Sequence, residues 1–245
     1  MPQFIIKSQD LSGSFFAVSG EEAHHLIRTL RKGVNDEIDF SDGQGNQYRG
    51  VITQIDQNAL TAKGRVLLKH HSPENPFRIH LYQGLPKSSK FDFVVEKATE
   101  LGATSICPFL SQKNIIKSDD RRGQTKQERW ARLAKAACKQ SGRTRFPRVE
   151  APRPLADYRD QFQQFPTLIL DPGEGGMTLA EVLKDRALLS GDINVVIGPE
   201  SGFHRKEIEW LQEGGGTVVK MEGLILRAET AGLVILSILN YENSR

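Results

Sequence analysis

The sequence contains few of the features that mark membrane, secreted or zinc-binding proteins. Its two cysteines, Cys107 and Cys138, form no CxxC pair, so neither a disulfide framework nor a zinc cluster is expected. The longest apolar run, near residues 231–239, is about half of the ~18 residues that a membrane-spanning helix needs. The first residues lack the basic start and apolar stretch of a secretory signal. We therefore expect a cytoplasmic protein.

Common phosphate- and metal-binding motifs are also missing. The chain has no GxxxxGK[ST] pattern and no GxGxxG after an expected strand, which argues against P-loop and ordinary dinucleotide sites. Its six histidines include two adjacent pairs, but none has HExxH spacing, so no metal site is expected. In Gly198–Gly202 the serine stands one place too late for the GxSxG motif of hydrolases.

Charge is present in both signs but is unevenly distributed. The 245 residues are 38% hydrophobic and 26% charged, with a net charge of only +3, as in an ordinary soluble globular protein. Between Lys113 and Arg148, however, twelve basic residues stand against three acidic ones. Such a concentration is typical of a surface that binds RNA or DNA, although a solvated helix face would carry the same charges.

The chain divides into two regions with different patterns. Residues 1–72 contain short, partly alternating apolar runs separated by polar turns, with one helix near residues 20–30, which predicts a small β-barrel-like domain. After the proline-containing segment 70–76, strands and helices alternate, which predicts a mostly parallel sheet with helices on both faces. The expected strands are 78–82, 105–110, 167–171, 194–197 and 217–221, and the expected helices are 91–101, 127–140, 178–188, 205–211 and 227–241.

Three of the expected strands end in glycine-containing turns, at residues 171–176, 198–202 and 221–224. In a parallel sheet these turns lie at the same edge, where open α/β folds bind their ligands. Glycine allows the backbone to approach a ligand closely. One such turn would mean little, but three in succession predict a small-molecule site.

Two of these segments resemble the motifs of a known superfamily. Residues 196–203, VIGPESGF, followed by Glu207, resemble the IGPEGG…E motif of the SPOUT methyltransferases, and residues 224–231, LILRAETA, resemble their ILRxETA motif. Upstream lie KATELG at 97–102, AACKQSGR at 136–143, and His25 with LRKG at 30–33 and DGQG at 42–45. In this order, over nearly the whole chain, the segments resemble the RsmE family, which methylates N3 of a uridine in small-subunit (16S) ribosomal RNA.

The resemblance implies a fold, a cofactor and partners. It implies a PUA-like RNA-binding β-barrel over residues 1–72 and an α/β SPOUT methyltransferase domain over residues 73–245, with a deep trefoil knot at the cofactor site. The implied methyl donor is S-adenosyl-L-methionine. The implied partners are small-subunit ribosomal RNA, or the assembled 30S particle, and a second copy of the chain bound through the SPOUT domain.

It also implies candidate site residues. Arg143 would stabilise negative charge on the uracil oxygens, although a phosphate contact is an alternative. Glu229 or Glu200 would accept the N3 proton, although Glu229 could serve only the helix dipole and Glu200 only the loop, in which case solvent would accept it. The cofactor would contact Leu170, Asp171, Gly198, Pro199, Glu200, Met221, Gly223, Leu224, Leu226, Arg227, Thr230 and Ala231. The RNA would contact Arg28, Arg31, Lys32, Lys87, Lys90, Lys113, Arg121, Arg122, Arg129 and Arg132.

The chain departs from the family pattern at two places. Ser201 replaces the second glycine of GPEGG, which the backbone tolerates if φ is negative there. Where relatives carry Leu-Gly-x-Arg, residues 221–224 read MEGL, so we expect altered side-chain contacts to the cofactor. Two alternative functions stay open: a non-catalytic RNA-binding or ribosome-assembly factor, and a SPOUT methyltransferase that acts on another RNA position, in tRNA or on a ribose hydroxyl.

Overall fold

The structure is a computed structural model that describes residues 4–71, 77–86, 90–114, 120–173, 175–223 and 225–245. It divides into two compact units. The first unit contains Met1–Glu74 and Cys138–Phe146, and the second contains Asn75–Ala137 and Pro147–Arg245. The sequence predicted a boundary near residue 72 but assigned the segment 138–146 to the second domain.

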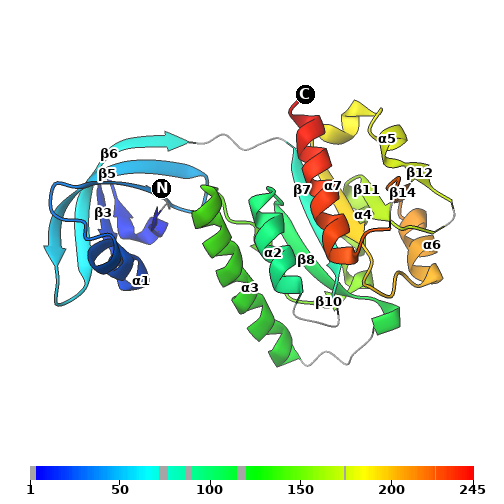
Figure 1. The fold of residues 1–245 in the computed structure, drawn as a ribbon, viewed down its shortest axis with the longest axis horizontal. Coiled ribbons are helices and arrows are strands. Elements are labelled where there is room, and N and C mark those ends of the chain that lie inside the picture. The colour runs from blue at the N-terminus through cyan, green and yellow to red at the C-terminus, as the bar shows by residue number, and fades with distance from the viewer. Residues whose placement is uncertain (1–3, 72–76, 87–89, 115–119, 174, 224) are drawn as a thin grey trace. The chain divides into compact units, whose positions relative to one another are not determined.

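The first unit is built on a six-stranded sheet with the order β1-β4-β5-β6-β3-β2. Figure 1 labels β3, β5 and β6 of this sheet. Its pairs are antiparallel except for β1 and β4, and its core includes Phe16, Phe40 and Ile52. The short helix α1 continues as a π-helical turn that buries Leu26 and Ile27. The elements are β1 (Phe4–Ile5), β2 (Leu11–Ser12), β3 (Phe15–Val18), α1 (Gly20–His24), the π turn (His25–Thr29), β4 (Glu37–Ser41), β5 (Asn46–Asp56) and β6 (Thr61–His71).

The second unit is built on an eight-stranded parallel sheet, in which β9 pairs with β8 beside the main order β10-β8-β7-β13-β11-β14-β12. The central strands are buried along their length because helices cover both faces, as expected for a parallel sheet. The strands are β7 (Arg78–Gly84), β8 (Ser105–Leu110), β9 (Arg148–Val149), β10 (Arg153–Pro154), β11 (Thr167–Leu170), β12 (Met177–Thr178), β13 (Asp192–Ile197) and β14 (Thr217–Lys220).

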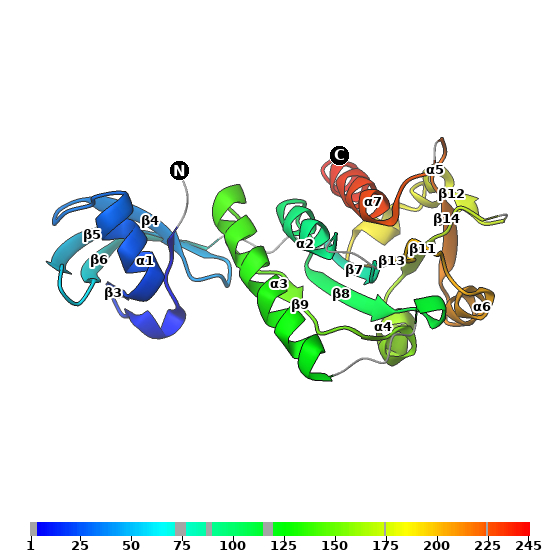
Figure 2. The ribbon, with the colours of Figure 1, turned by 60° about the horizontal axis from the view of Figure 1, so that its bottom comes forward.

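Helices from different parts of the chain cover the two faces of this sheet (Figure 2). On one face α2 and α7 lie side by side, and α7 buries Ile235, Leu236 and Leu239. On the other face α4 and α6 contribute Phe162 and Leu211. The helices are α2 (Phe91–Glu100), α3 (Asp120–Ser141), α4 (Arg159–Gln164), α5 (Leu179–Val182), α6 (Arg205–Glu213) and α7 (Ala228–Asn243).

Several elements differ from the sequence prediction, which did not include the short strands β9, β10 and β12. Helix α3 begins before the predicted residue 127, at Asp120. The single helix predicted over 178–188 is two short helices, because the side chain of Asp185 accepts a hydrogen bond from the Ala187 N–H and starts a new 3-10 turn, Arg186–Leu189. The turn Leu155–Tyr158 and helix α4 were not predicted, although Leu155, Tyr158 and Phe162 are buried at helical spacing.

The segment 138–146 joins the first unit through several contacts. The Lys139 ammonium pairs with the Glu22 carboxylate. The Gly45 N–H donates to the Thr144 carbonyl at 3.1 Å, and the Phe146 N–H donates to the Gly43 carbonyl at 3.0 Å. These contacts tie the end of α3 to α1 and the residues after α3 to the DGQG turn at 42–45.

Candidate functional site at the carboxyl edge of the parallel sheet

Two of the three glycine-containing turns that the sequence singled out, at 171–176 and 198–202, contribute residues to one cavity, and residues 225–227, which follow the third turn, line it as well. It has a volume of about 370 Å³ and lies at the carboxyl ends of β11 and β13 and beside the start of α7. Strand ends and the loop before α7 supply apolar walls, and charged side chains complete the lining. The lining residues are Lys90, Leu170, Asp171, Pro172, Ile197, Gly198, Pro199, Glu200, Gly202, Phe203, Ile225, Leu226, Arg227, Ala228 and Ala231.

Close backbone approach explains the glycines at this edge. A Cβ at Gly84, the last residue of β7, would lie 2.4 Å from the Pro199 nitrogen, so the β7 end and the loop after β13 pack without room for a side chain. In that loop the left-handed conformation falls on Gly202, with φ of 69°. Ser201 is not among the non-glycine residues of the described chain that have a positive φ. Serine is therefore tolerated at position 201, as the sequence predicted.

A lysine lies between two carboxylates at the cavity. The Lys90 Nζ is 2.8 Å from Glu200 Oε1 and 3.1 Å from Glu229 Oε1. Hydrogen bonds to Glu200 and then to Glu229 raise the pKa of Lys90, so it stays protonated. The Glu229 side chain is 12% exposed, and its Oε2 has no hydrogen-bond partner among the residues that the structure describes. One carboxylate oxygen is thus held by a cation while the other is left unoccupied.

The pKa of Glu229 is set by opposing effects. Burial raises this pKa. A hydrogen bond from its own backbone N–H, the contact with Lys90 and the charge of Arg227 lower it, and together they outweigh burial. The net pKa lies below the usual value for glutamate. Glu229 is therefore a carboxylate at neutral pH and can accept a hydrogen bond or a proton.

Glu207, the glutamate that follows the VIGPESGF segment, connects two loops near the cavity by hydrogen bonds. It is 4% exposed, and its carboxylate accepts hydrogen bonds from the Ser111 hydroxyl at 2.8 Å and the Gln112 N–H at 2.9 Å. It also accepts from the His204 N–H at 2.7 Å, which forms the N-terminal capping box of α6. Glu207 thus fixes the loop after β8 against the loop after β13.

The structure brings together most of the cofactor-binding residues predicted from the sequence. Eight of the twelve line the cavity, and Glu200 among them also contacts Lys90. Met221 instead packs against the hydrophobic core, Gly223 and Thr230 are not part of the lining, and Leu224 lies outside the described residues. The eight are Leu170, Asp171, Gly198, Pro199, Glu200, Leu226, Arg227 and Ala231.

Several predicted RNA-binding residues of the second unit have protein partners. Lys90 pairs with the two glutamates, the Lys113 ammonium donates to the Ser201 carbonyl at 3.1 Å, and Arg129 pairs with Asp92. Arg132 is exposed on α3. Lys87 and the side chains of Arg121 and Arg122 lie outside the described residues.

The other predicted basic residues belong to the first unit. Arg28 donates to the Gln57 carbonyl at 3.5 Å, and Lys32 donates to the Glu37 carbonyl at 3.3 Å. Arg31 has a left-handed backbone, with φ of 52°. Arg143 also belongs to this unit, and its carboxyl-side neighbours contact the DGQG turn. Burial lowers the pKa of Arg143, but an arginine remains protonated at neutral pH.

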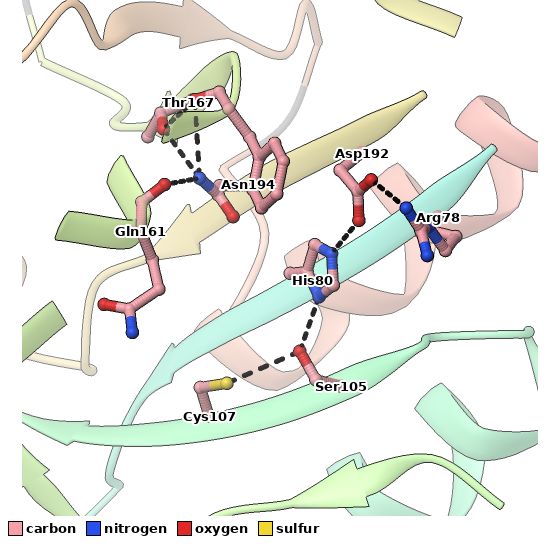
Figure 3. Close-up of polar contacts among 9 residues, drawn as sticks. Arg78, His80, Ser105, Cys107, Gln161, Thr167, Asp192 and Asn194 are labelled. Carbon is pink, nitrogen blue, oxygen red and sulfur yellow. Dashed lines mark hydrogen bonds and ion pairs between the residues drawn. The ribbon is translucent and has the colours of Figure 1, made fainter. Parts of the chain in front are cut away.

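The opposite, amino edge of the parallel sheet carries a chain of polar contacts (Figure 3). His80 on β7 contacts the Asp192 carboxylate on β13 through Nε2 at 2.7 Å and the Ser105 hydroxyl on β8 through Nδ1 at 2.8 Å. Arg78 also donates to Asp192, at 2.5 Å, and the Cys107 thiol lies 3.5 Å from the Ser105 hydroxyl. These contacts join three neighbouring strands.

Neither cysteine has the environment of a nucleophile. Burial raises the pKa of Cys107 to about 12 and that of Cys138 to about 11, so both are thiols at neutral pH. Within the described residues, no cluster of histidine, cysteine and acidic side chains is arranged to hold a metal ion. The helices of the described ranges include none that is long and apolar enough to span a membrane.

Comparisons with known proteins assign both units. The model of an RNA methyltransferase domain matches residues 73–240, and that of an RNA methyltransferase PUA domain matches residues 18–63. Relatives named ribosomal RNA small subunit methyltransferase E include one from Aquifex aeolicus, 30% identical over 96% of this chain and 98% of its own length. Another, from Bacillus subtilis, is 28% identical over 97% of this chain and 94% of its own length.

A solved structure gives the same result. The protein described as a ribosomal RNA small subunit methyltransferase E from Neisseria gonorrhoeae bound to S-adenosyl methionine superposes with a TM-score of 0.81 and 28% identity, over 98% of this chain and 97% of its own. The described fold therefore agrees with the predicted α/β methyltransferase domain preceded by a PUA-like domain. The chain belongs to the family of RNA methyltransferases that includes the ribosomal RNA small subunit methyltransferase E proteins.

Proposed function

We propose that this protein transfers a methyl group from S-adenosyl-L-methionine to N3 of a uridine in 16S ribosomal RNA. The observation that supports this most strongly is the convergence of three strand-end loops on one cavity. Ligands of open parallel α/β sheets bind at this edge. Family membership supports the reaction class, and the resemblance of residues 136–143 to the uridine-N3 enzymes supports the position of the methyl group.

The cavity residues suit the proposed donor. A volume of about 370 Å³ lies within the range of small-molecule sites, and the apolar side chains of Leu170, Leu226 and Ala231 would hold the adenosine portion. When bound, the donor supplies a methyl group on a positively charged sulfonium. The nearby carboxylate of Glu200 would favour that positive charge.

The reaction also requires removal of the N3 proton from the uracil ring. We assign this step to Glu229, since Lys90 holds its Oε1 and leaves the buried Oε2 without a partner among the described residues. Glu200 is the alternative acceptor, and it contacts the same lysine. Because N3 is occupied in a Watson–Crick pair, the target uridine must be unpaired or flipped out of the helix.

Removal of the proton spreads negative charge onto the uracil carbonyl oxygens. We assign its stabilisation to Arg143, whose planar guanidinium can donate two hydrogen bonds. The variant Arg143→Ala should lose at least about 100-fold in kcat while its affinity for S-adenosyl-L-methionine, measured by calorimetry, stays within about twofold. Arg205→Ala, which removes an exposed arginine on α6 that is not assigned to RNA or to the donor, is the matched control. A large loss of donor affinity in Arg143→Ala would contradict the assignment.

We further propose that the active protein is a cytoplasmic homodimer joined through its SPOUT domain. Its RNA partner is 16S ribosomal RNA, free or in the assembled 30S particle. The PUA domain and the basic residues Arg28, Arg31 and Lys32 would contact phosphates, so RNA affinity should fall steeply with salt.

The decisive experiment compares ribosomal RNA from cells with and without this protein. Mass spectrometry should find one 3-methyluridine that is lost in the deletion strain and restored by the cloned gene. Calorimetry with S-adenosyl-L-methionine distinguishes the methyltransferase from a non-catalytic assembly factor, because the assembly factor would bind RNA but not the donor. Methylation at a ribose hydroxyl or in tRNA would instead favour the other enzyme function.

A further inference from the structure

The first unit contains a second cavity, of about 610 Å³, that the proposed reaction does not use. Its apolar lining comes from Phe4, Leu30, Ile38 and Leu68. Two of these are unusually exposed for leucines, Leu30 at 40% and Leu68 at 62%. Apolar side chains left open to solvent inside a hollow are typical of a binding site.

Polar groups of several kinds complete this hollow. Gln47 and His70 provide side chains that can both donate and accept hydrogen bonds, as the edges of nucleobases do. The Tyr48 ring in the wall is fixed by stacking on Phe40 at 5.0 Å and by a hydrogen bond from its hydroxyl to Asp42 at 3.2 Å. The hollow thus combines a preformed aromatic wall with hydrogen-bonding groups.

The lining of the hollow carries charges of both signs. It includes the acids Glu37 and Asp39 and the bases Lys32 and Arg49, and Asp39 is paired with Arg49 at 2.8 Å. The segment 138–146 of the same unit adds Lys139, Arg143 and Arg145 to the otherwise neutral residues 1–72 and gives the unit a surplus of positive charge. Gly142 of that segment lies in the lining itself.

We propose that this hollow binds one unpaired base of the RNA substrate while basic residues of the same unit contact the neighbouring phosphates. The proposal rests on the proposed function, and it adds a site for a base other than the methylated one. A rigid, apolar hollow with mixed hydrogen-bonding groups fits a flat heterocycle, which RNA presents only in single-stranded loops, bulges and ends. Residues 136–143, AACKQSGR, which carry part of the family resemblance, would thus border a base-binding site through Gly142.

Two adjacent leucines provide a matched test. Leu68 lines the hollow, whereas Leu67, which is 45% exposed, does not. Leu68→Glu and Leu67→Glu introduce the same charge into neighbouring positions of β6, and neither removes a buried side chain. Overlapping fluorescein-labelled fragments of 16S ribosomal RNA would be titrated with the full-length protein and followed by fluorescence anisotropy. For the fragment that binds best, Leu68→Glu should weaken affinity by about tenfold, and Leu67→Glu by less than about twofold.

A second measurement shows that a base is what binds. Single abasic substitutions would be made along the single-stranded part of that fragment. At one position the loss of the base should weaken binding to the wild type by about tenfold and leave the affinity of the Leu68→Glu variant unchanged. The proposal would be overturned if the two glutamate variants bound RNA equally well, or if the wild type bound none of the fragments. It would also be overturned if the loss of affinity from Leu68→Glu and that from the abasic substitution were additive. Donor binding by calorimetry and methylation by the wild type are recorded separately. A protein that binds the base but does not methylate would refute only the proposed function.

Discussion

The two edges of the parallel sheet use polar residues in opposite ways. At the amino edge, His80 joins Asp192 and Ser105 at 2.7 and 2.8 Å, so these side chains satisfy one another across three strands. At the carboxyl edge, Lys90 and Glu200 line a cavity, and Glu229 keeps one oxygen without a partner among the described residues. The side chains of His80, Asp192 and Ser105 at the amino edge are occupied with one another, although Asn194 Oδ1 beside them has no partner among the described residues, and the carboxyl edge leaves charged groups available to a ligand.

This difference shows how function and stability can be separated within one sheet. Hydrogen-bonded polar groups at strand ends hold the strands in register. Buried polar groups without a partner destabilise the fold, and a ligand that bonds to them removes this destabilisation. Substitutions at the amino edge should therefore change the free energy of unfolding with little effect on the reaction. Substitutions at the carboxyl edge should do the reverse.

The largest effect is expected at the carboxyl edge. Glu229→Gln removes the proposed proton acceptor but keeps the shape of the side chain, so kcat for methyl transfer to ribosomal RNA should fall by about 100-fold or more. The melting temperature should change little. The control is Glu222→Gln, an exposed glutamate in the preceding loop. If both variants retain wild-type kcat, solvent or Glu200 accepts the proton.

A smaller effect, on stability alone, is expected at the amino edge. Asp192→Ala leaves His80 and Arg78 without their shared carboxylate and should lower the free energy of unfolding by about 1–3 kcal/mol. Denaturant unfolding would measure this, with Glu213→Ala, an exposed glutamate on α6, as the control. At a temperature where the variant is folded, its kcat should match that of the wild type. A selective loss of kcat would show that the two edges are coupled.

The smallest effect concerns pH. Lys90 lowers the pKa of Glu229, so Lys90→Met should raise that pKa. The reaction needs the carboxylate form of Glu229. When the pH is lowered, the Lys90→Met variant should therefore lose its activity at a higher pH than the wild type does. The pH dependence of kcat for the two proteins checks this direction. An acid limb that does not move would place Glu229 outside the reaction.

The sequence predicted the elements that have a clear apolar pattern. Strand β8 has the predicted bounds, Ser105–Leu110, and the buried residues of α2 include Val94, Val95 and Ala98, which recur at helical spacing. It missed α4, whose six residues carry only one buried side chain, Phe162. The predicted knot stays a prediction.

The site was predictable to the extent that it depends on backbone turns. Glycine-containing turns after parallel strands must meet at one edge, and Gly198 and Asp171 indeed line the same cavity. The position of Lys90 was not predictable in this way. It precedes α2, far along the chain from Glu200 and Glu229, and as a lone lysine it was assigned to RNA phosphates. Packing of α2 against α7 brings Lys90 to Glu229, and the loop after β13 brings Glu200 to the same lysine.

The sequence by itself determined the order of the main strands and helices, the edge at which the ligand site lies and the family to which the chain is similar. These depend on local periodicity and on motifs that persist along the chain. The tertiary structure alone decided which unit holds the segment 138–146, which charges face one another at the cavity, and that His80 serves the sheet. Such features depend on residues distant in sequence, whose meeting is fixed by packing and not by any local pattern.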